Sequence, residues 1–547
     1  MQATMMNVPL SLNHLLDRAG QLFGSNTVVS RLPDKSLRTH TYAEYHRRTR
    51  ALASALQQLG LARGDRVATL CWNHHAHLEC YFGIPAAGGV MHTLNLRLAA
   101  DEIGWIAGNA QDRVLIVDDV LLPLYRQFAH LHHFEHVIVF PFSGAPVPAG
   151  FLDYEQMLLG ADPDGFTYAE HGEDDPVSMC YTSGTTGRPK GVVYSHRSTV
   201  LHALVGCLAD CWRLSAEDVV LPVTPMFHAN SWGIPYGAVM MGAKLVFPGP
   251  HLHPNDLLDL IQAEPPTITL GVPTIWMGLI QTYEQALATE PGRWKLPVGL
   301  RSLVGGAAVP EALIRKFAKH SVHIMQGWGM TETSPLATVS GPVNAPSGAD
   351  ENERFRRAAM AGVRVPLVDL RIRTDDGTDA AWDGASMGEI QVRGPFITGA
   401  YHEVPVTDDK FTPDGWLRTG DVATIDSLGF VRITDRTKDL IKSGGEWISS
   451  VDLENALMAH PAIAEAAVIA IPDEKWSERP LACVVFKAGQ NMATAAPAEL
   501  AALLAPHLLA HGFAKWQLPE RYEVIDAVPR TSTGKFWKVK LRERFPR

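Results

Sequence analysis

Cysteine is scarce in this chain. Only six occur among 547 residues, and no two stand in a Cys-x-x-Cys pair. Disulfide frameworks and structural zinc sites need cysteines at paired or regular spacings, so this pattern argues against both. Scattered single cysteines are typical of reduced core positions, and they predict a cytoplasmic protein.

Long hydrophobic runs and an excess of positive charge are also missing. No stretch approaches about 18 uninterrupted apolar residues, so we expect no transmembrane helix and at most peripheral membrane contact. The first residues lack the basic and apolar regions of a secretory signal. The net charge of −10 argues against nucleic acid as the main partner. With 46% hydrophobic and 19% charged residues over this length, the composition predicts a globular protein of two or more domains.

The most informative stretch is residues 181–191, Tyr-Thr-Ser-Gly-Thr-Thr-Gly-Arg-Pro-Lys-Gly, which follows an apolar run at 177–181 that predicts a buried strand. Glycines allow tight turns, while hydroxyls and free N–H groups can surround phosphate oxygens. Arg188 and Lys190 would offset the negative charge of a polyphosphate. The common P-loop has no proline before its lysine, so Pro189 indicates a different loop, a flap that closes over phosphates. A plain polar surface turn is the alternative.

Four further motifs follow in order: 327–333 (Gly-Trp-Gly-Met-Thr-Glu-Thr), 415–421 (Gly-Trp-Leu-Arg-Thr-Gly-Asp), 435–446 (Asp-Arg-Thr-Lys-Asp-Leu-Ile-Lys-Ser-Gly-Gly-Glu) and 529–535 (Pro-Arg-Thr-Ser-Thr-Gly-Lys). Together with the loop, they resemble the signatures of the adenylate-forming enzymes, which include acyl-CoA synthetases, luciferases and peptide-synthetase adenylation domains. The resemblance covers nearly the whole chain. Within the family the chain is most similar to bacterial medium- and long-chain fatty acyl-CoA synthetases.

The predicted fold is α/β. Strands alternate with helical segments before residue 140 and again at 246–308, which indicates two parallel sheets with crossover helices. Short alternating strands at 361–434 predict a small β-rich subdomain. The resemblance implies an N-terminal adenylation domain, residues 1–436, and a mobile α/β C-terminal domain, residues 437–547, with a hinge near Lys438.

Caps, breakers and polar stretches predict individual elements. Thr41 is a candidate cap for a helix over 42–59. A short buried helix is expected over 77–84, which Pro85 would end or kink, and a surface loop over 343–357.

Two histidine clusters, His74/His75/His77 and His130/His132/His133/His136, raise the possibility of a metal site. Ordinary packing is the favoured interpretation, because metal ligands come with a fixed geometry and supporting carboxylates.

The resemblance implies that the chain binds ATP, Mg²⁺ and coenzyme A. A carboxylate suits Mg²⁺, and the implied metal-binding residues are Thr182 and Glu332. Asp421, just past a glycine, can accept both ribose hydroxyls. Most relatives carry Tyr where Trp328 stands, and either ring can stack on adenine. The implied catalytic residues are Lys535, Thr182, Glu332 and His228. The implied nucleotide-binding and CoA-binding residues are Thr182, Ser183, Gly184, Thr185, Thr186, Gly187, Lys190, Gly306, Gln326, Gly327, Trp328, Thr331, Asp421, Arg436, Lys438, Lys442, Gly444, Gly445, Glu446 and Trp447.

The segment 225–233 bears on the carboxylate substrate. Amino-acid-activating relatives place an Asp where His228 stands, so the substrate is expected to lack an α-amine. In the fatty-acyl branch the residue matching Trp232 gates the acyl tunnel; filling the core is the alternative role.

We therefore predict an ATP- and Mg²⁺-dependent fatty acyl-CoA ligase that works through an acyl-adenylate. A ligase for a short substituted acid such as 3-methylthiopropionate, a luciferase-type oxidative enzyme and a non-catalytic acyl or nucleotide sensor are the alternatives. The intact Thr182, Glu332, Asp421 and Lys535 argue against the sensor. The resemblance also implies a homodimer.

Overall fold

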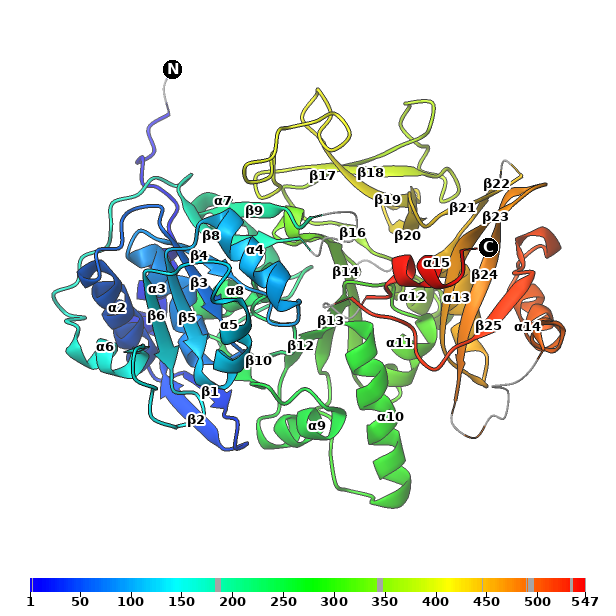
Figure 1. Ribbon diagram of the computed structural model, residues 1–547. Coiled ribbons are helices and arrows are strands. Elements are labelled where there is room, and N and C mark those ends of the chain that lie inside the picture. The colour runs from blue at the N-terminus through cyan, green and yellow to red at the C-terminus, as the bar shows by residue number, and fades with distance from the viewer. Residues whose placement is uncertain are drawn as a thin grey trace.

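The computed structural model describes residues 1, 3–182, 188–341, 348–444, 446–487, 489, 496–531 and 535–546. Their strands form four sheets, two large ones in the N-terminal part and two smaller ones after residue 368 (Figure 1). None of the helices in these ranges is long and apolar enough to cross a bilayer. The predicted α/β architecture is confirmed.

The first large sheet has seven strands in the order β7-β6-β5-β3-β4-β8-β9. All neighbours are parallel except β8 and β9, the two strands that flank residues 182–190. The strands are β3 (Arg66–Leu70), β4 (Val90–Thr93), β5 (Val114–Asp118), β6 (His136–Phe140), β7 (Leu152–Asp153), β8 (Pro176–Tyr181) and β9 (Gly191–Ser195). The helices between them are α3 (His75–Ala86), α4 (Ala100–Ala110), α5 (Leu122–Phe128) and α6 (Tyr154–Gly160).

The second large sheet has nine strands in the order β16-β15-β14-β13-β12-β10-β11-β1-β2, and its central strands are parallel. The strands are β1 (Thr27–Arg31), β2 (Leu37–Thr41), β10 (Val219–Pro222), β11 (Lys244–Phe247), β12 (Ile268–Gly271), β13 (Arg301–Gly305), β14 (His323–Gly329), β15 (Leu336–Val339) and β16 (Val363–Arg364). The other helices before residue 368 are α1 (Leu12–Leu22), α2 (Tyr42–Gln58), α7 (His196–Cys207), α8 (Ile234–Met241), α9 (Pro254–Ala263), α10 (Pro273–Thr289), α11 (Glu311–Ala318) and α12 (Glu351–Ala358). One buried apolar cluster reaches from α1 across both sheets to the small β-rich sheet.

The predicted β-rich subdomain is a four-stranded antiparallel sheet of β17 (Asp369–Arg373), β18 (Gly388–Arg393), β19 (Leu417–Ile425) and β20 (Val431–Arg436). The C-terminal unit has its own buried clusters. It consists of strands β21 (Ile441–Ser443), β22 (Glu446–Ile448), β23 (Ile463–Asp473), β24 (Ser477–Phe486) and β25 (Arg521–Val524) and helices α13 (Ser450–Ala459), α14 (Pro497–Ala510) and α15 (Lys538–Arg544). It lies on the right in Figure 1, beyond β20.

Capping side chains and proline explain where three of the predicted elements begin and end. Thr41 caps α2 as expected, and Glu44 completes a capping box by accepting from the Thr41 backbone N–H. The helix expected over 77–84 begins earlier, at His75, and ends at Ala86, one residue after Pro85. The loop expected over 343–357 is wrong in part, because Asp350 caps a helix over Glu351–Ala358. That helix has a mostly charged sequence, so its apolar periodicity is weak.

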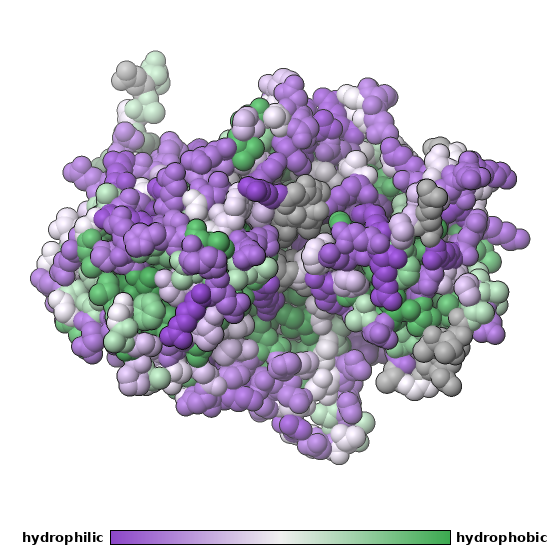
Figure 2. Space-filling view, in the orientation of Figure 1, coloured by the Kyte–Doolittle hydropathy of each residue, from purple (hydrophilic) through white to green (hydrophobic). Residues whose placement is uncertain are grey.

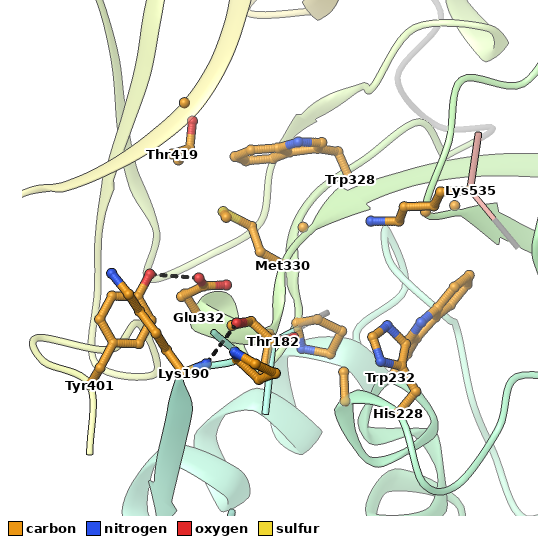
Figure 3. Close-up of a pocket in the computed structure, with 18 of the residues that line it drawn as sticks. Thr182, Lys190, His228, Trp232, Trp328, Met330, Glu332, Tyr401, Thr419 and Lys535 are labelled. Carbon is orange, nitrogen blue, oxygen red and sulfur yellow. Dashed lines mark hydrogen bonds between the residues drawn. The ribbon is translucent and has the colours of Figure 1, made fainter. Parts of the chain in front are cut away.

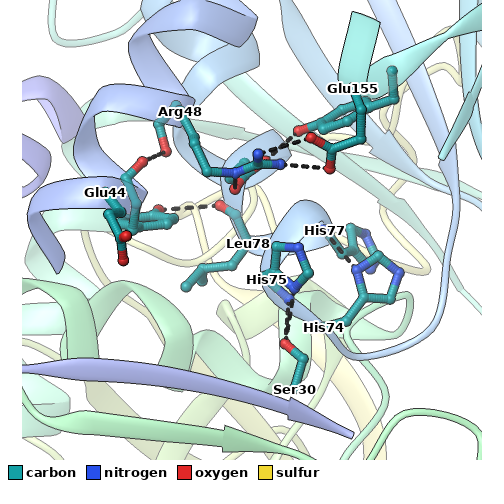
Figure 4. A network of polar contacts seen from close by, with 12 residues as sticks. Ser30, Glu44, Arg48, His74, His75, His77, Leu78 and Glu155 are labelled. Atoms are coloured by element: carbon teal, nitrogen blue, oxygen red, sulfur yellow. Dashed lines mark hydrogen bonds and ion pairs between the residues drawn. The ribbon is translucent and has the colours of Figure 1, made fainter. Parts of the chain in front are cut away.

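The first histidine cluster is part of the core (Figure 4). His74 Nδ1 accepts the backbone N–H of His77 at 3.2 Å and so caps α3, while its Nε2–H donates to Asp118 at 2.8 Å. Cys71 lies beside this pair. Since both ring nitrogens of His74 are engaged, it has no lone pair left for a metal, and packing remains the favoured interpretation. Beside the cluster, Arg48 joins α2 to α3 and α6 through Glu79 and Glu155.

Candidate active site

A cavity of about 700 Å³ opens where the carboxyl ends of the parallel strands of both large sheets meet the β-rich sheet and the C-terminal unit. Its walls come from the ends of β8, β10, β12, β13 and β14, and from Lys535. Ligands in open α/β sheets bind at this end of the strands. The face seen in Figure 2 is mostly hydrophilic, and hydrophobic residues show in its central recess.

Many residues predicted from the sequence meet at this cavity. Those that line it are Thr182, Lys190, His228, Trp232, Gly306, Gly327, Trp328, Thr331, Glu332, Arg436, Lys438 and Lys535 (Figure 3). An adjoining cavity of about 240 Å³ shares several of them and adds Gln326 and Asp421. The predicted phosphate-loop residues Ser183, Gly184, Thr185, Thr186 and Gly187, together with Gly445, lie outside the described residues.

The residues predicted to meet coenzyme A are elsewhere. Of those that the structure describes, Lys442, Gly444, Glu446 and Trp447 line neither cavity. They belong to the β21–β22 hairpin, where the Lys442 ammonium lies 4.2 Å from the centre of a Trp447 ring. Their role in CoA binding stays a prediction that depends on movement of the C-terminal unit.

Thr182 and Lys190 are held together at the base of the phosphate loop. The Lys190 backbone N–H donates to Thr182 Oγ1 at 3.1 Å, and the Thr182 N–H donates to the Lys190 carbonyl at 2.9 Å. The second bond extends the β8–β9 backbone pairing by one step, and the first adds the Thr182 side chain to it, so both residues stay at the cavity wall. The Lys190 ammonium lies 4.9 Å from the ring centre of Tyr401, a cation–π contact.

Glu332 lies in the short helix η3 (Thr331–Thr333), and only 6% of the residue is exposed. Its Oε1 accepts the Tyr401 hydroxyl at 2.7 Å (Figure 3). Its Oε2 forms no hydrogen bond with any residue that the structure describes, and Glu332 lines the cavity. A carboxylate oxygen of this kind, with the Thr182 hydroxyl in the same wall, fits the hard oxygen ligands that Mg²⁺ prefers. Sequence reasoning missed Tyr401, since a lone tyrosine after Gly399-Ala400 carries no polar pattern.

Trp328 and Asp421 meet at the boundary of the two cavities. The indole N–H of Trp328 donates to Asp421 Oδ2 at 2.8 Å, and Arg436 Nε lies 3.2 Å from Asp421 Oδ1. Both carboxylate oxygens are therefore oriented while keeping further acceptor capacity. Gly306 borders the same space with φ +81°, a conformation that favours glycine.

Lys535 reaches into the main cavity from the C-terminal unit and lies above His228 and Trp232 in Figure 3. Its Cε lies 3.7 Å from the point that a β-carbon on Gly306 would occupy. Burial lowers the pKa of Lys535 to about 8; repulsion from Arg436 adds to this effect, and Asp421 and Glu332 oppose it. An anionic ligand in the cavity would favour the charged ammonium.

His228 and Trp232 line the more apolar side of the cavity, with Phe227, Leu303 and Leu336. Burial lowers the pKa of His228 to about 3, with the nearby cations contributing, so its imidazole is neutral at pH 7. Residues 229–232 all have positive φ, from 44° to 59°. Backbone strain of this kind is found at ligand sites. The tip of the Trp232 ring lies 3.5 Å from the point that a β-carbon on Gly305 would occupy.

Comparisons with known proteins show the family of this chain. The AMP-binding enzyme family matches residues 16–402, and the AMP-binding enzyme C-terminal domain matches residues 452–535. A long-chain-fatty-acid–CoA ligase of Thermus thermophilus is 46% identical over 545 residues, which are 99% of this chain and 97% of the relative. A 3-methylmercaptopropionyl-CoA ligase of Ruegeria lacuscaerulensis is 42% identical and covers 100% of this chain and 99% of its own length.

The fold also matches a solved structure. The crystal structure of an anthranilate CoA ligase in complex with anthranoyl-AMP has a TM-score of 0.85 at 25% identity, and the match covers 100% of this chain and 99% of that one. The chain therefore belongs to the AMP-binding enzyme family of adenylate-forming enzymes, with a large N-terminal domain and a small C-terminal domain.

Proposed function

We propose that this protein is an ATP-dependent fatty acid–CoA ligase that forms an acyl-adenylate, passes the acyl group to coenzyme A and releases AMP and pyrophosphate. The observation that carries the proposal is the convergence of Lys535, Glu332 and the Thr182–Lys190 pair on one cavity whose other side is apolar. Family membership and the CoA-ligase relatives support it.

In the first half-reaction the substrate carboxylate attacks the α-phosphorus of ATP and pyrophosphate leaves. Charge builds on the phosphate oxygens, so positioning and electrostatics supply most of the catalysis. Lys535 and Lys190 would face this charge, Thr331 would bond the α-phosphate, and Asp421 would hold the ribose hydroxyls. Glu332 and Thr182 would hold Mg²⁺, and the bound ion would neutralise charge on the phosphate oxygens.

In the second half-reaction the thiol of coenzyme A attacks the acyl carbonyl and AMP leaves. Lys535 occupies the cavity in this structure, and we propose that it withdraws when residues 437–547 turn about Lys438 relative to residues 1–436. The β21–β22 hairpin, with Lys442, Gly444, Glu446 and Trp447, would then approach the pantetheine arm. Rotation about a short hinge is a common way to serve two reactions with one site.

The substrate is a carboxylic acid without an α-amine. The neutral His228 offers no negative charge to an ammonium group, and the apolar wall beside it suits a hydrocarbon chain. We assign Trp232 to gating the entry of that chain. A short thioether acid is the second candidate, favoured by the 3-methylmercaptopropionyl-CoA ligase relative.

Two further proposals concern the location and the assembly of the protein. A cytoplasmic location is supported by six free cysteines, five of them buried. A homodimer is proposed from the resemblance alone, and light scattering would measure it.

The test is AMP release with ATP, Mg²⁺ and coenzyme A across straight-chain acids from three to eighteen carbons, together with 3-methylthiopropionate. A maximum at medium or long chains is the expected result. A maximum at short or thioether acids would retain the mechanism and change the substrate. No CoA-dependent release with any acid would reject the ligase.

A further inference from the structure

The interface between β20 and the C-terminal unit contains a buried carboxylate that the proposed chemistry does not use. Asp435 stands three residues before the hinge residue Lys438, and it is 1% exposed. Its Oδ2 accepts the backbone N–H of Ser450 at 2.7 Å and the Ser450 hydroxyl at 2.5 Å, while its Oδ1 accepts the Arg436 N–H at 2.8 Å. Ser450 is the first residue of α13, so two of these bonds cross from the N-terminal domain to the C-terminal unit.

The same serine connects to the segment that carries the active-site lysine. Lys538 follows Lys535 by three residues and begins α15. Its ammonium donates to Ser450 Oγ at 2.5 Å and pairs with Glu454 at 2.7 Å. Hydrogen bonds from Asp435 to Ser450 and from Ser450 to Lys538 therefore connect β20, the last strand before the hinge, to the start of α15, three residues after Lys535.

Rotation of the C-terminal unit would affect these contacts unequally. Ser450, Glu454 and Lys538 all belong to that unit and would move together, so the Lys538–Glu454 pair would persist. Asp435 would lose both bonds to Ser450 and its attraction to Lys538. A buried carboxylate without partners is unfavourable, whereas water can hydrate one that rotation exposes. The Asp435–Ser450 contact is therefore specific to the arrangement that places Lys535 in the cavity.

We propose that Asp435 is a positioning residue for Lys535: it fastens the C-terminal unit, through Ser450 and Lys538, in the arrangement that makes the acyl-adenylate. The inference rests on the proposed function. It assigns no role to Asp435 in the thioester-forming step, where the contact would be broken. Apolar side chains could fill the same interface, but they would lack the directional bonds that select one orientation.

The test separates the two half-reactions in Asp435→Asn and Ser450→Ala. Pyrophosphate exchange into ATP reports adenylate formation. CoA thioester formation from a synthetic acyl-adenylate, made from the acid that wild type uses fastest, reports the second step. Both variants are expected to lose about tenfold in the first rate and to stay within twofold of wild type in the second.

A matched control lies on the same interface. Asp452 of α13 pairs with Arg432 of β20 at 2.7 Å, and both side chains are partly exposed. Asp452→Asn removes a charge across the same two elements and is expected to leave both rates within twofold, because exposed pairs contribute little.

Four outcomes would overturn the proposal: equal losses in both half-reactions, no loss in either, a loss confined to the second, or a tenfold loss in Asp452→Asn as well. Ser450→Ala keeps the backbone bond to Asp435, so it provides the answer if Asp435→Asn does not fold. A wild-type enzyme without exchange activity on any acid would instead show that the proposed function has failed.

Discussion

The indole N–H of Trp328 donates a hydrogen bond to Oδ2 of Asp421 across 2.8 Å. Trp328 lies on β14 and Asp421 on β19, in two different sheets. Most relatives are expected to carry Tyr at position 328, yet the tryptophan still supplies a donor beside its flat ring. The two residues predicted to hold adenine and ribose are therefore coupled to each other.

This coupling predicts a nucleotide-specific defect in Trp328→Phe. Phenylalanine keeps an aromatic face but lacks the N–H, so Asp421 should be less well oriented toward the ribose. We expect the Kd for AMP, measured by calorimetry, to rise about tenfold, consistent with one hydrogen bond to a charged group. For 2′-deoxy-AMP the same substitution should raise the Kd by a smaller factor, because one ribose hydroxyl is already missing. An equal rise in Kd for both nucleotides would contradict the coupling.

The hydroxyl of Tyr401 is expected to orient the carboxylate of Glu332, which we propose as a Mg²⁺ ligand. Tyr401→Phe removes the 2.7 Å bond to Glu332 and keeps the ring beneath the Lys190 ammonium. Loss of a partner that orients a metal ligand typically weakens metal binding about 10–100-fold. We therefore expect a rise of about tenfold in the free Mg²⁺ concentration that gives half-maximal pyrophosphate exchange. The Mg²⁺ concentration needed for ATP binding, measured by calorimetry, should rise by the same factor. A lower maximal rate at an unchanged Mg²⁺ requirement would indicate a different role.

The lowered pKa of Lys535 predicts how adenylate formation depends on pH. The ammonium is the form that stabilises phosphate charge, and with a pKa of about 8 it is lost as the pH rises through 8. The value of kcat/KM for ATP, which reports the free enzyme, should therefore fall above pH 8. Lys535→Arg should be slower at pH 7 but should lack this fall. A wild-type profile that is flat to pH 9.5 would exclude the titration.

Removing the Lys535 side chain should affect the half-reactions differently. Lys535→Ala is expected to reduce pyrophosphate exchange at least a hundredfold, an effect of roughly 3 kcal/mol that is typical of one lost electrostatic contact to the transition state. Thioester formation from supplied acyl-adenylate should stay within severalfold of wild type, because the lysine is proposed to have left the cavity. Similar losses in both steps would argue against the rotation.

His74 should act as a structural residue and not as a metal ligand. His74→Ala removes the cap of α3 and the bond to Asp118, so the unfolding free energy should fall by about 1–3 kcal/mol. His74→Asn should recover part of the loss, since asparagine is a good cap. Prolonged treatment of wild type with EDTA should leave its thermal midpoint unchanged, and a clear decrease would point to a bound metal.

Local patterns in the sequence were enough for much of the fold and for the family. The strand over Pro176–Tyr181 and the helix over Tyr42–Gln58 follow from apolar periodicity and from caps that act within one turn. The five motifs identified the family because each is a short continuous segment. The charged helix over Glu351–Ala358 was missed because its sequence shows little apolar periodicity.

Only the tertiary structure decided which of these residues meet. Sequence spacing carries no information about the Trp328–Asp421, Tyr401–Glu332 and Asp435–Ser450 contacts, whose partners come from different elements. Such contacts depend on strand order, on register and on how the C-terminal unit packs against β20. The local motifs of the sequence therefore determine which reactive side chains this protein has. Their positions relative to one another depend on packing between distant segments, which short-range propensities do not predict.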